Sequence, residues 1–315
     1  MLIFGKANIH SLSRHINTPP TTATSCNTPK ALFTLNPSTP LSQPAKTSHN
    51  FSLYTAIMSA SNRLSVSVQP LNYADVHACA QITSDAFAID PHTIVKGLGR
   101  KPYDMYDIMR SMLLDGLERK KQIYVKAVDK ETGEIVGHAG WAFKDVDEAA
   151  IPWTRPSDDK SAAKEEPRPK KDEPENEDTG DVEEKREEDL IDRLKALESR
   201  DMQYWQTNII PQDKPCVFIT GLHVSVSHQS RGVGTVMLQY GNAIADKLGL
   251  TIWVHSSHQA YEAYQKAGFE AVKELDLDLD EWAPRGPRVG EAIMGDKGSE
   301  KWGRYIIRYM KRDPK

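Results

Sequence analysis

The spacing of apolar and polar residues divides much of the chain into short elements. Alternation of apolar and polar positions predicts strands, joined in one place by the hairpin turn Glu131-Thr132-Gly133, over residues 63–71, 122–129 and 134–143. Apolar residues at helical spacing predict helices over residues 73–87, 103–121, 189–205, 232–248 and 260–267. Continuous apolar character predicts a central strand over residues 216–226, and shorter patterns predict strands over residues 251–255, 269–277 and 304–310.

The order of these elements is β-α-α-β-β-α-β-α-β-α-β-β. The sequence therefore predicts one mixed α/β domain over residues 63–311, interrupted by an insertion between the third strand and the third helix.

Composition excludes two classes of protein. The net charge of -4 leaves no electrostatic footprint for nucleic acid, and no stretch approaches the ~20 apolar residues of a membrane span. Neither a nucleic-acid partner nor membrane insertion is therefore expected. The three cysteines, Cys26, Cys79 and Cys216, are too few for a disulfide-stapled secreted domain, so a reducing compartment is favoured.

Residues 1–62 differ in composition from the rest of the chain. Residues 1–74 hold five basic residues and no Asp or Glu, and they are rich in Ser, Thr, Pro and Asn. Such a composition is typical of a mitochondrial transit peptide, and the alternative is a plain disordered extension. We therefore expect residues 1–62 to be disordered and the protein to be cytoplasmic or mitochondrial.

Residues 155–188 form a second segment of biased composition. With Asp189 included, they contain fifteen acidic and eight basic residues, no aromatic residue, and Val182 as the only β-branched aliphatic. A segment of this kind buries too little apolar surface to offset its ordering entropy. The sequence predicts a disordered acidic insertion, which is a solvated surface loop or, alternatively, a docking segment for a protein partner.

The most informative stretch runs from the apolar strand into the fourth helix. Gln229-Ser230-Arg231-Gly232-Val233-Gly234 separates the two elements. The first amides of a helix lack intrahelical partners, and glycines let the backbone approach an anion closely. The turn therefore predicts a pyrophosphate cradle with Arg231 beside it. It lacks the Gly-Lys-Ser/Thr of a Walker A loop and the third glycine of a dinucleotide fingerprint, and a simple packing turn is the alternative.

The motif and its surroundings resemble the GNAT superfamily of N-acetyltransferases. Gln229-x-x-Gly232-x-Gly234 matches the family's Q/R-x-x-G-x-G/A signature. Tyr264 to Phe269 resembles the Y-x-x-x-G-F end of the family's next helix. More narrowly, Ala245-Asp246, His255-Ser256-Ser257 and Leu279-Asp280-Glu281-Trp282 look like fungal members of unassigned substrate. The resemblance implies a mostly antiparallel central sheet flanked by helices and transfer of an acetyl group from acetyl-CoA to an amine.

The resemblance also implies which residues contact the acyl donor. Its central strands splay apart beside Val224, and the pantetheine arm pairs with the backbone of Leu222 and Val224. The amide of Val224 polarises the thioester carbonyl and is in that sense catalytic. The remaining implied contacts, most of them amides around the pyrophosphate, are His223, Gln229, Ser230, Arg231, Gly232, Val233, Gly234, Thr235 and Ser257.

Tyr264 matches the family tyrosine that protonates the departing CoA thiolate. A thiol with a pKa of about 8.5 leaves more easily when a nearby hydroxyl stabilises the developing anion. Tyr261 lies three residues earlier and competes for this role, and pure packing is the other interpretation of Tyr264.

The base that deprotonates the amine is left open by the sequence. His223, His255 and His258 are candidates, and His223 is expected on the opposite face of its strand from Leu222 and Val224. No acidic residue lies between Cys216 and Val226, where some protein-acetylating members carry their base. A metal site is not expected, because the histidine spacing lacks a helical zinc motif and no carboxylate completes it.

The sequence thus favours an acetyl-CoA-dependent N-acetyltransferase that acts on a small amine by direct transfer. Two alternatives stay open: a catalytically weak CoA-binding module with an acidic interaction loop, and an acetyltransferase for a protein amine. An acyl group larger than acetyl is also compatible with the motifs.

Overall fold

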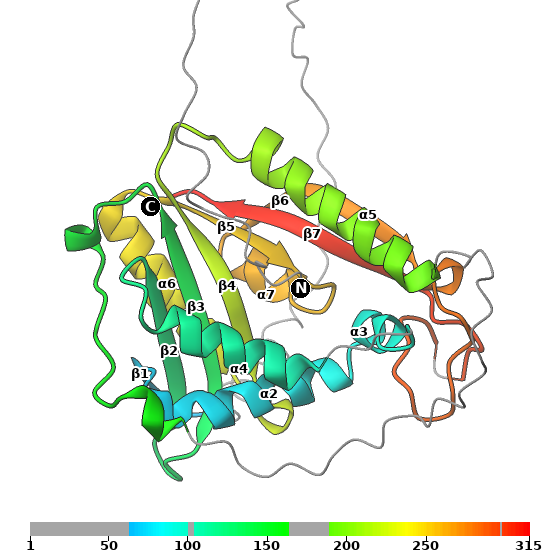
Figure 1. Ribbon diagram of the computed structural model, residues 1–315, viewed down its shortest axis with the longest axis horizontal. Coiled ribbons are helices and arrows are strands. Elements are labelled where there is room, and N and C mark those ends of the chain that lie inside the picture. The colour runs from blue at the N-terminus through cyan, green and yellow to red at the C-terminus, as the bar shows by residue number, and fades with distance from the viewer. Residues whose placement is uncertain (1–62, 100–103, 164–188, 297) are drawn as a thin grey trace, which may run out of the picture. The chain divides into compact units, whose positions relative to one another are not determined.

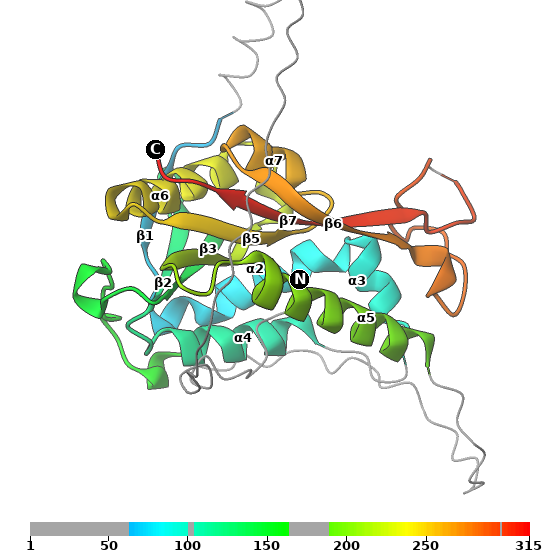
Figure 2. The same cartoon turned by 90° about the horizontal axis from the view of Figure 1, so that it is seen from above.

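One seven-stranded sheet, with helices on both faces, organises the computed structural model (Figures 1 and 2). The structure describes residues 63–99, 104–163, 189–296 and 298–315. The predicted extension at 1–62 therefore lies outside the described residues, as does most of the predicted acidic insertion.

The sheet has the strand order β1-β2-β3-β4-β5-β7-β6. Every neighbouring pair is antiparallel except β4 with β5, which is parallel. This mixed, mostly antiparallel sheet confirms the predicted fold class. The strands span Val66–Pro70, Gln122–Asp129, Ile135–Lys144, Cys216–Val224, Thr251–Ser256, Glu270–Asp278 and Arg304–Arg312 in the order β1 to β7.

The helices lie in two layers. The long helix α6 (Val233–Leu248) and the short α7 (Tyr261–Lys266) lie on one face of the sheet, as Figure 2 shows. The other face carries α2 (Val76–Ala88), α3 (Pro91–Lys96), α4 (Met105–Gly116) and α5 (Leu190–Tyr204). No described helix is long and apolar enough to cross a membrane.

Short helical turns complete the chain. A π-helix, Trp205–Ile209, continues α5 directly. The 3-10 turns are η1 (Tyr73–Asp75), η2 (Glu148–Ala150), η3 (Lys160–Ala162), η5 (Val226–His228) and η6 (Leu279–Glu281).

The main core lies between the sheet and α6. The buried face of α6 holds Val233, Met237, Leu238, Gly241 and Ala245, which is the helical periodicity that predicted the element. They pack with inward residues of β2 to β5 and with Tyr264 and Phe269. This packing fixes the first turn of α6 at the end of β4.

Three predictions about elements need correction. Helix α3 was not predicted, although Asp90 caps it by accepting a hydrogen bond from the Thr93 amide at 2.9 Å and Pro91 occupies its first turn. The helix predicted over 103–121 ends at Gly116, and the strand predicted over 216–226 ends at Val224, before the 3-10 turn η5. In each case a local start or stop signal was outweighed by hydrophobic periodicity.

The first residues of the predicted acidic insertion are ordered. Residues 155–163 are described, and the Asp158 carboxylate accepts hydrogen bonds from the amides of Tyr73 and Ala74, each at 2.8 Å. Lys160 forms a salt bridge with Glu118 at 2.9 Å. These tertiary contacts order a segment whose composition alone predicts disorder, and residues 164–188 lie outside the described ranges.

Candidate active site

The two parallel strands at the centre of the sheet pair only at their beginnings. β4 and β5 are in register at Cys216 with Thr251, Val217 with Ile252, and Phe218 with Trp253. Beyond Phe218, β4 stays with β3, whereas β5 stays with β7. The strands therefore diverge, as the family resemblance implied, and one edge of β4 has no strand beside it.

A β-bulge explains where the divergence starts. The register between β3 and β4 shifts between the pairs Gly140–Gly221 and Trp141–Ile219, which leaves Thr220 as an extra residue on β4. A bulge of this kind bends its strand and increases the twist. A Cβ on Gly140 would lie 2.5 Å from the Thr220 hydroxyl, so a glycine is needed opposite the bulge.

The unpaired edge of β4 exposes the backbone of Leu222 and Val224. The Ser225 amide donates to the Val136 carbonyl of β3 at 2.9 Å. Because backbone groups alternate between the two edges of a strand, those of Leu222 and Val224 point away from β3. They point into the gap, where an extended ligand can pair with them.

The turn after β4 presents its amides to the same gap. Gly232 is the N-cap of α6 with φ 87°, and Ser230 has φ 59°, so both adopt left-handed conformations. No side chain caps the helix, whose first intrahelical bond joins the Val236 amide to the Gly232 carbonyl. The amides of Val233, Gly234 and Thr235 are thus the free donors of a helix N-terminus.

Two residues of the turn, Gln229 and Arg231, support this arrangement. The side-chain amide of Gln229 donates to the Val224 carbonyl at 3.3 Å, so on Val224 it is the backbone amide that stays available to a ligand. The Arg231 carbonyl accepts from the Leu64 amide at 3.0 Å. The Nε of Arg231 is buried and has no hydrogen-bond partner among the described residues. A buried guanidinium nitrogen without a partner fits a site that receives an anion, so the residues present fit the diphosphate of an acyl carrier.

Tyr264 is buried on α7, on the same face of the sheet as α6. It is 4% exposed, and its ring packs edge-on against Phe269 at 5.3 Å between centroids. Burial raises the pKa of its hydroxyl, which therefore stays protonated at physiological pH. Tyr261 is more exposed: its hydroxyl accepts a hydrogen bond from Gln265, and Arg308 stacks on its ring at 3.9 Å.

His223 does not lie where its predicted contact with the acyl donor requires. It pairs with His138 of β3 across the strands, and its side chain is buried beneath α2 beside Phe87. Its backbone groups face β3 by the same alternation that frees those of Leu222 and Val224. Only the expectation that its side chain points to the opposite face agrees with the structure.

The residues after β5 fall at the open end of the gap. The Ser257 carbonyl accepts a hydrogen bond from the Ser256 hydroxyl at 2.9 Å. His258 accepts from the Ile306 amide through Nδ1 at 3.0 Å, which fixes its ring on β7. His255 is the histidine of β5 itself, and its Nδ1 has no hydrogen-bond partner among the described residues.

A buried ionic cluster joins α5 and α3 on the face of the sheet opposite α6. Glu198 of α5 is 1% exposed, and its carboxylate contacts the His92 imidazole and, at 2.6 Å, the Lys96 ammonium. The sequence analysis missed this cluster. A signal was present, because Glu198 continues the buried stripe of Ile191, Leu194 and Met202 along α5, where an apolar residue is expected.

Within the described residues, no group of three or more His, Cys, Asp or Glu side chains is arranged to hold a metal ion. The described cysteines, Cys79 and Cys216, are buried free thiols, and burial raises their pKa values. Neither cysteine therefore offers a reactive thiolate to the site.

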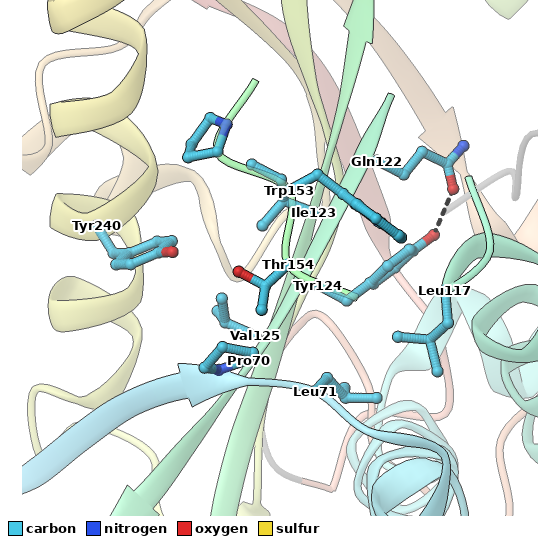
Figure 3. Close-up of a pocket in the computed structure, with 11 residues that line it drawn as sticks. Pro70, Leu71, Leu117, Gln122, Ile123, Tyr124, Val125, Trp153, Thr154 and Tyr240 are labelled. Atoms are coloured by element: carbon cyan, nitrogen blue, oxygen red, sulfur yellow. Dashed lines mark hydrogen bonds between the residues drawn. The ribbon is translucent and has the colours of Figure 1, made fainter. Parts of the chain in front are cut away.

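A separate small pocket lies where β2 begins (Figure 3). Pro70, Trp153 and Tyr240 line it, together with Tyr124, whose hydroxyl donates to the Gln122 side chain at 3.1 Å. Strands β2 and β3 separate it from the free edge of β4. Because no charged residue or histidine lines it, it is not suited to a diphosphate or to proton transfer.

A diverging parallel strand pair followed by an uncapped, glycine-rich helix start is the arrangement that the resemblance to N-acetyltransferases implied. Residues 200–269 match the family model described as acetyltransferase (GNAT) family, and they include the end of α5, β4, the turn, α6 and Tyr264. Over these residues the chain is similar to the GNAT family of acetyltransferases.

Solved acetyltransferase structures are similar to this chain at low identity. The histone acetyltransferase HPA2 and related acetyltransferase from Corynebacterium glutamicum is 18% identical, with 80% of this chain and 98% of that chain covered and a TM-score of 0.42. Arylalkylamine N-acetyltransferase 2 from Aedes aegypti is 12% identical, with 79% and 99% covered and a TM-score of 0.45. Arabidopsis thaliana NAA60 is 12% identical, with 79% and 98% covered and a TM-score of 0.39. No curated protein matches the chain.

Proposed function

We propose that this enzyme transfers the acetyl group of acetyl-CoA directly to the amine of a small molecule. The observation that carries the proposal is the free edge of β4 at Leu222 and Val224, which leads into the uncapped start of α6. An extended acyl-pantetheine arm pairs with the edge, and the amides of Gln229 to Thr235 bind the diphosphate. The contact roles of Ser230, Arg231, Gly232, Val233, Gly234 and Ser257 belong to the same proposal.

The proposed chemistry needs a donor at the sulfur and polarisation at the carbonyl. The Val224 amide polarises the thioester carbonyl, and the Tyr264 hydroxyl gives its proton to the departing thiolate. Burial supports the role of Tyr264, because a phenol with a raised pKa is fully protonated when the reaction begins.

One observation favours a small acceptor over a protein tail. β4 carries no acidic residue, so the base used by some protein-acetylating members is missing.

The test uses the purified full-length protein. We expect calorimetry to detect CoA and acetyl-CoA binding, and we expect release of CoA thiol that depends on a small primary amine. The acceptor panel contains arylalkylamines, polyamines and peptides with a free N-terminus or lysine. Binding without acceptor-dependent thiol release supports the weak CoA-binding module instead, and turnover of peptides alone overturns the choice of a small amine.

A further inference from the structure

His255 lies at the end of β5, past the last residue pair that joins β5 to β4. That pair is Phe218 with Trp253, so His255 belongs to the diverging part of the strand. It shares a face with Trp253, two residues earlier, which packs on the side of the sheet that α5 covers. The divergence therefore leaves the imidazole beside the gap, on the face opposite α6.

The imidazole of His255 is held in place but is not used by the fold. Its ring packs against Tyr309 of β7 at 5.1 Å between centroids, and the side chain is half-buried. Nδ1 is buried without a hydrogen-bond partner, and Nε2 forms no hydrogen bond with the described residues either. A buried polar atom left unpaired costs free energy, which makes a structural role a poor explanation for a histidine here.

The cluster of Glu198, His92 and Lys96 lies on the same face of the sheet as His255. Burial alone would raise the pKa of Glu198, but its contacts with His92 and Lys96 hold that pKa well below its usual range, so the carboxylate is ionised. The cluster is locked to the sheet, because the His92 ring stacks on Tyr305 at 4.8 Å and the Tyr305 hydroxyl donates to Asp90 at 3.0 Å.

The groups that act on His255 come from every element packed around it. Burial lowers the pKa of His255 most strongly; Glu198 of α5 opposes this effect, while His92 and Lys96 of α3 add to it. On the side of β7, Tyr309 separates His255 from the Lys273–Asp201 salt bridge. At neutral pH His255 is therefore an uncharged base, and the charges of Glu198 and Lys96 act on it in opposite directions.

We propose that His255 is the catalytic residue that accepts the proton of the acceptor amine, with Glu198, His92 and Lys96 as positioning residues behind it. The other two candidate histidines are less suited to accept a proton at the gap. His223 is buried beneath α2, and His258 uses Nδ1 to accept from the Ile306 amide. This assignment rests on the proposed function, because it requires an amine in the gap.

The proton balance is as follows. The ammonium form of the acceptor gives one proton to Nε2 of His255, and the freed lone pair forms the C–N bond at the thioester carbonyl. The C–S bond breaks, and the thiolate takes the proton of the Tyr264 hydroxyl. The attacking amine nitrogen then loses its second proton, which restores that hydroxyl. His255 then releases its proton to solvent, so one proton, one amide and one CoA thiol leave for each ammonium and thioester consumed.

The first test is the pH profile of kcat/KM for His255→Gln, measured with the amine that the wild-type enzyme turns over best. We expect the wild-type rate to fall on an acid limb below pH 6.5, and the variant to lose that limb together with about 100-fold in kcat. Acetyl-CoA affinity and thermal stability should not change. His258→Gln is the matched control and should keep the wild-type profile.

The second test separates positioning from simple structural support. Glu198→Gln removes the group that raises the proton affinity of His255, so the acid limb should move to lower pH; Lys96→Met should move it to higher pH. Shifts of opposite sign support the proposal, and equal profiles for both variants overturn the role of the cluster. If both variants fail to fold, His255→Gln still decides the assignment, which an unchanged profile and rate would overturn. Inactive wild-type enzyme instead points to failure of the proposed function.

Discussion

His138 of β3 and His223 of β4 lie directly opposite each other beneath α2, with their ring centroids 4.7 Å apart. His138 Nε2 and the Thr83 hydroxyl share a hydrogen bond of 2.7 Å, whereas Nδ1 of His223 is buried without a partner among the described residues. Burial lowers the pKa of His138 to about 4 and that of His223 well below its usual value. The pair is therefore stable only while both rings are uncharged.

This pair predicts a loss of stability in mild acid. A histidine whose pKa is lower in the folded state binds protons more readily when unfolded, so its contribution is complete above pH 6.5 and falls as the pH drops below that value. We expect each ring to cost about 1 kcal/mol of unfolding free energy at pH 5.5 relative to pH 7.5. Urea denaturation of wild type and His223→Leu at the two pH values measures it, and the variant should lose less. Equal losses would contradict the assignment to this pair.

A second prediction concerns Tyr264. Replacing it by Phe removes only a hydroxyl that has no hydrogen-bond partner among the described residues, so the fold and acetyl-CoA binding should be retained. Without a proton donor for the thiolate, kcat should fall about 100-fold. Tyr261→Phe, one turn earlier on α7, is the control and should keep near-normal turnover. A Tyr264→Phe enzyme with wild-type kcat removes this residue from the mechanism.

A third prediction tests the anion site at the start of α6. A Cβ on Gly234 would meet only the Val224 side chain, at 3.7 Å, so Gly234→Ala should fold normally. The added methyl group crowds a ligand held against the first-turn amides, and the Kd for CoA should rise at least 10-fold. The KM for acetyl-pantetheine, which lacks the diphosphate, should change little. An equal loss for both donors shows that the methyl group acts on the pantetheine arm instead.

A fourth prediction concerns the contact between α6 and the sheet. A Cβ on Gly241 would lie 2.3 Å from the indole of Trp141, which is 2% exposed and has no room to move. Alanine favours a helix over glycine by about 1 kcal/mol, but overpacking of this kind costs about 1–3 kcal/mol, and the clash should win. Chemical denaturation measures the change. Gly295→Ala, where no atom lies within 4 Å of the new methyl group, should stay within about 0.5 kcal/mol of wild type.

Local sequence patterns account for most of the elements. The stripe on α6, the alternation in β2 and the glycines of the turn act within a few residues, so they are visible without a structure. The short helix α3 was missed because its capping signals, Asp90 and Pro91, are weaker than a long hydrophobic period. The order of residues 155–163 was missed because it comes from contacts with η1 and with Glu118 just after α4, which composition does not encode.

The sequence by itself indicated the similarity to the GNAT family, the mixed sheet and the glycine-rich turn after β4, because each depends on residues that are near one another along the chain. Only the tertiary structure decided where β4 and β5 diverge, since the bulge at Thr220 depends on the register with β3. It also gave the histidines different surroundings: His223 is buried against His138, while His255 lies past the last residue pair of β4 and β5 and is acted on by Glu198 from a distant helix. Charge and burial at such a site depend on neighbours far apart in sequence, which only folding brings together.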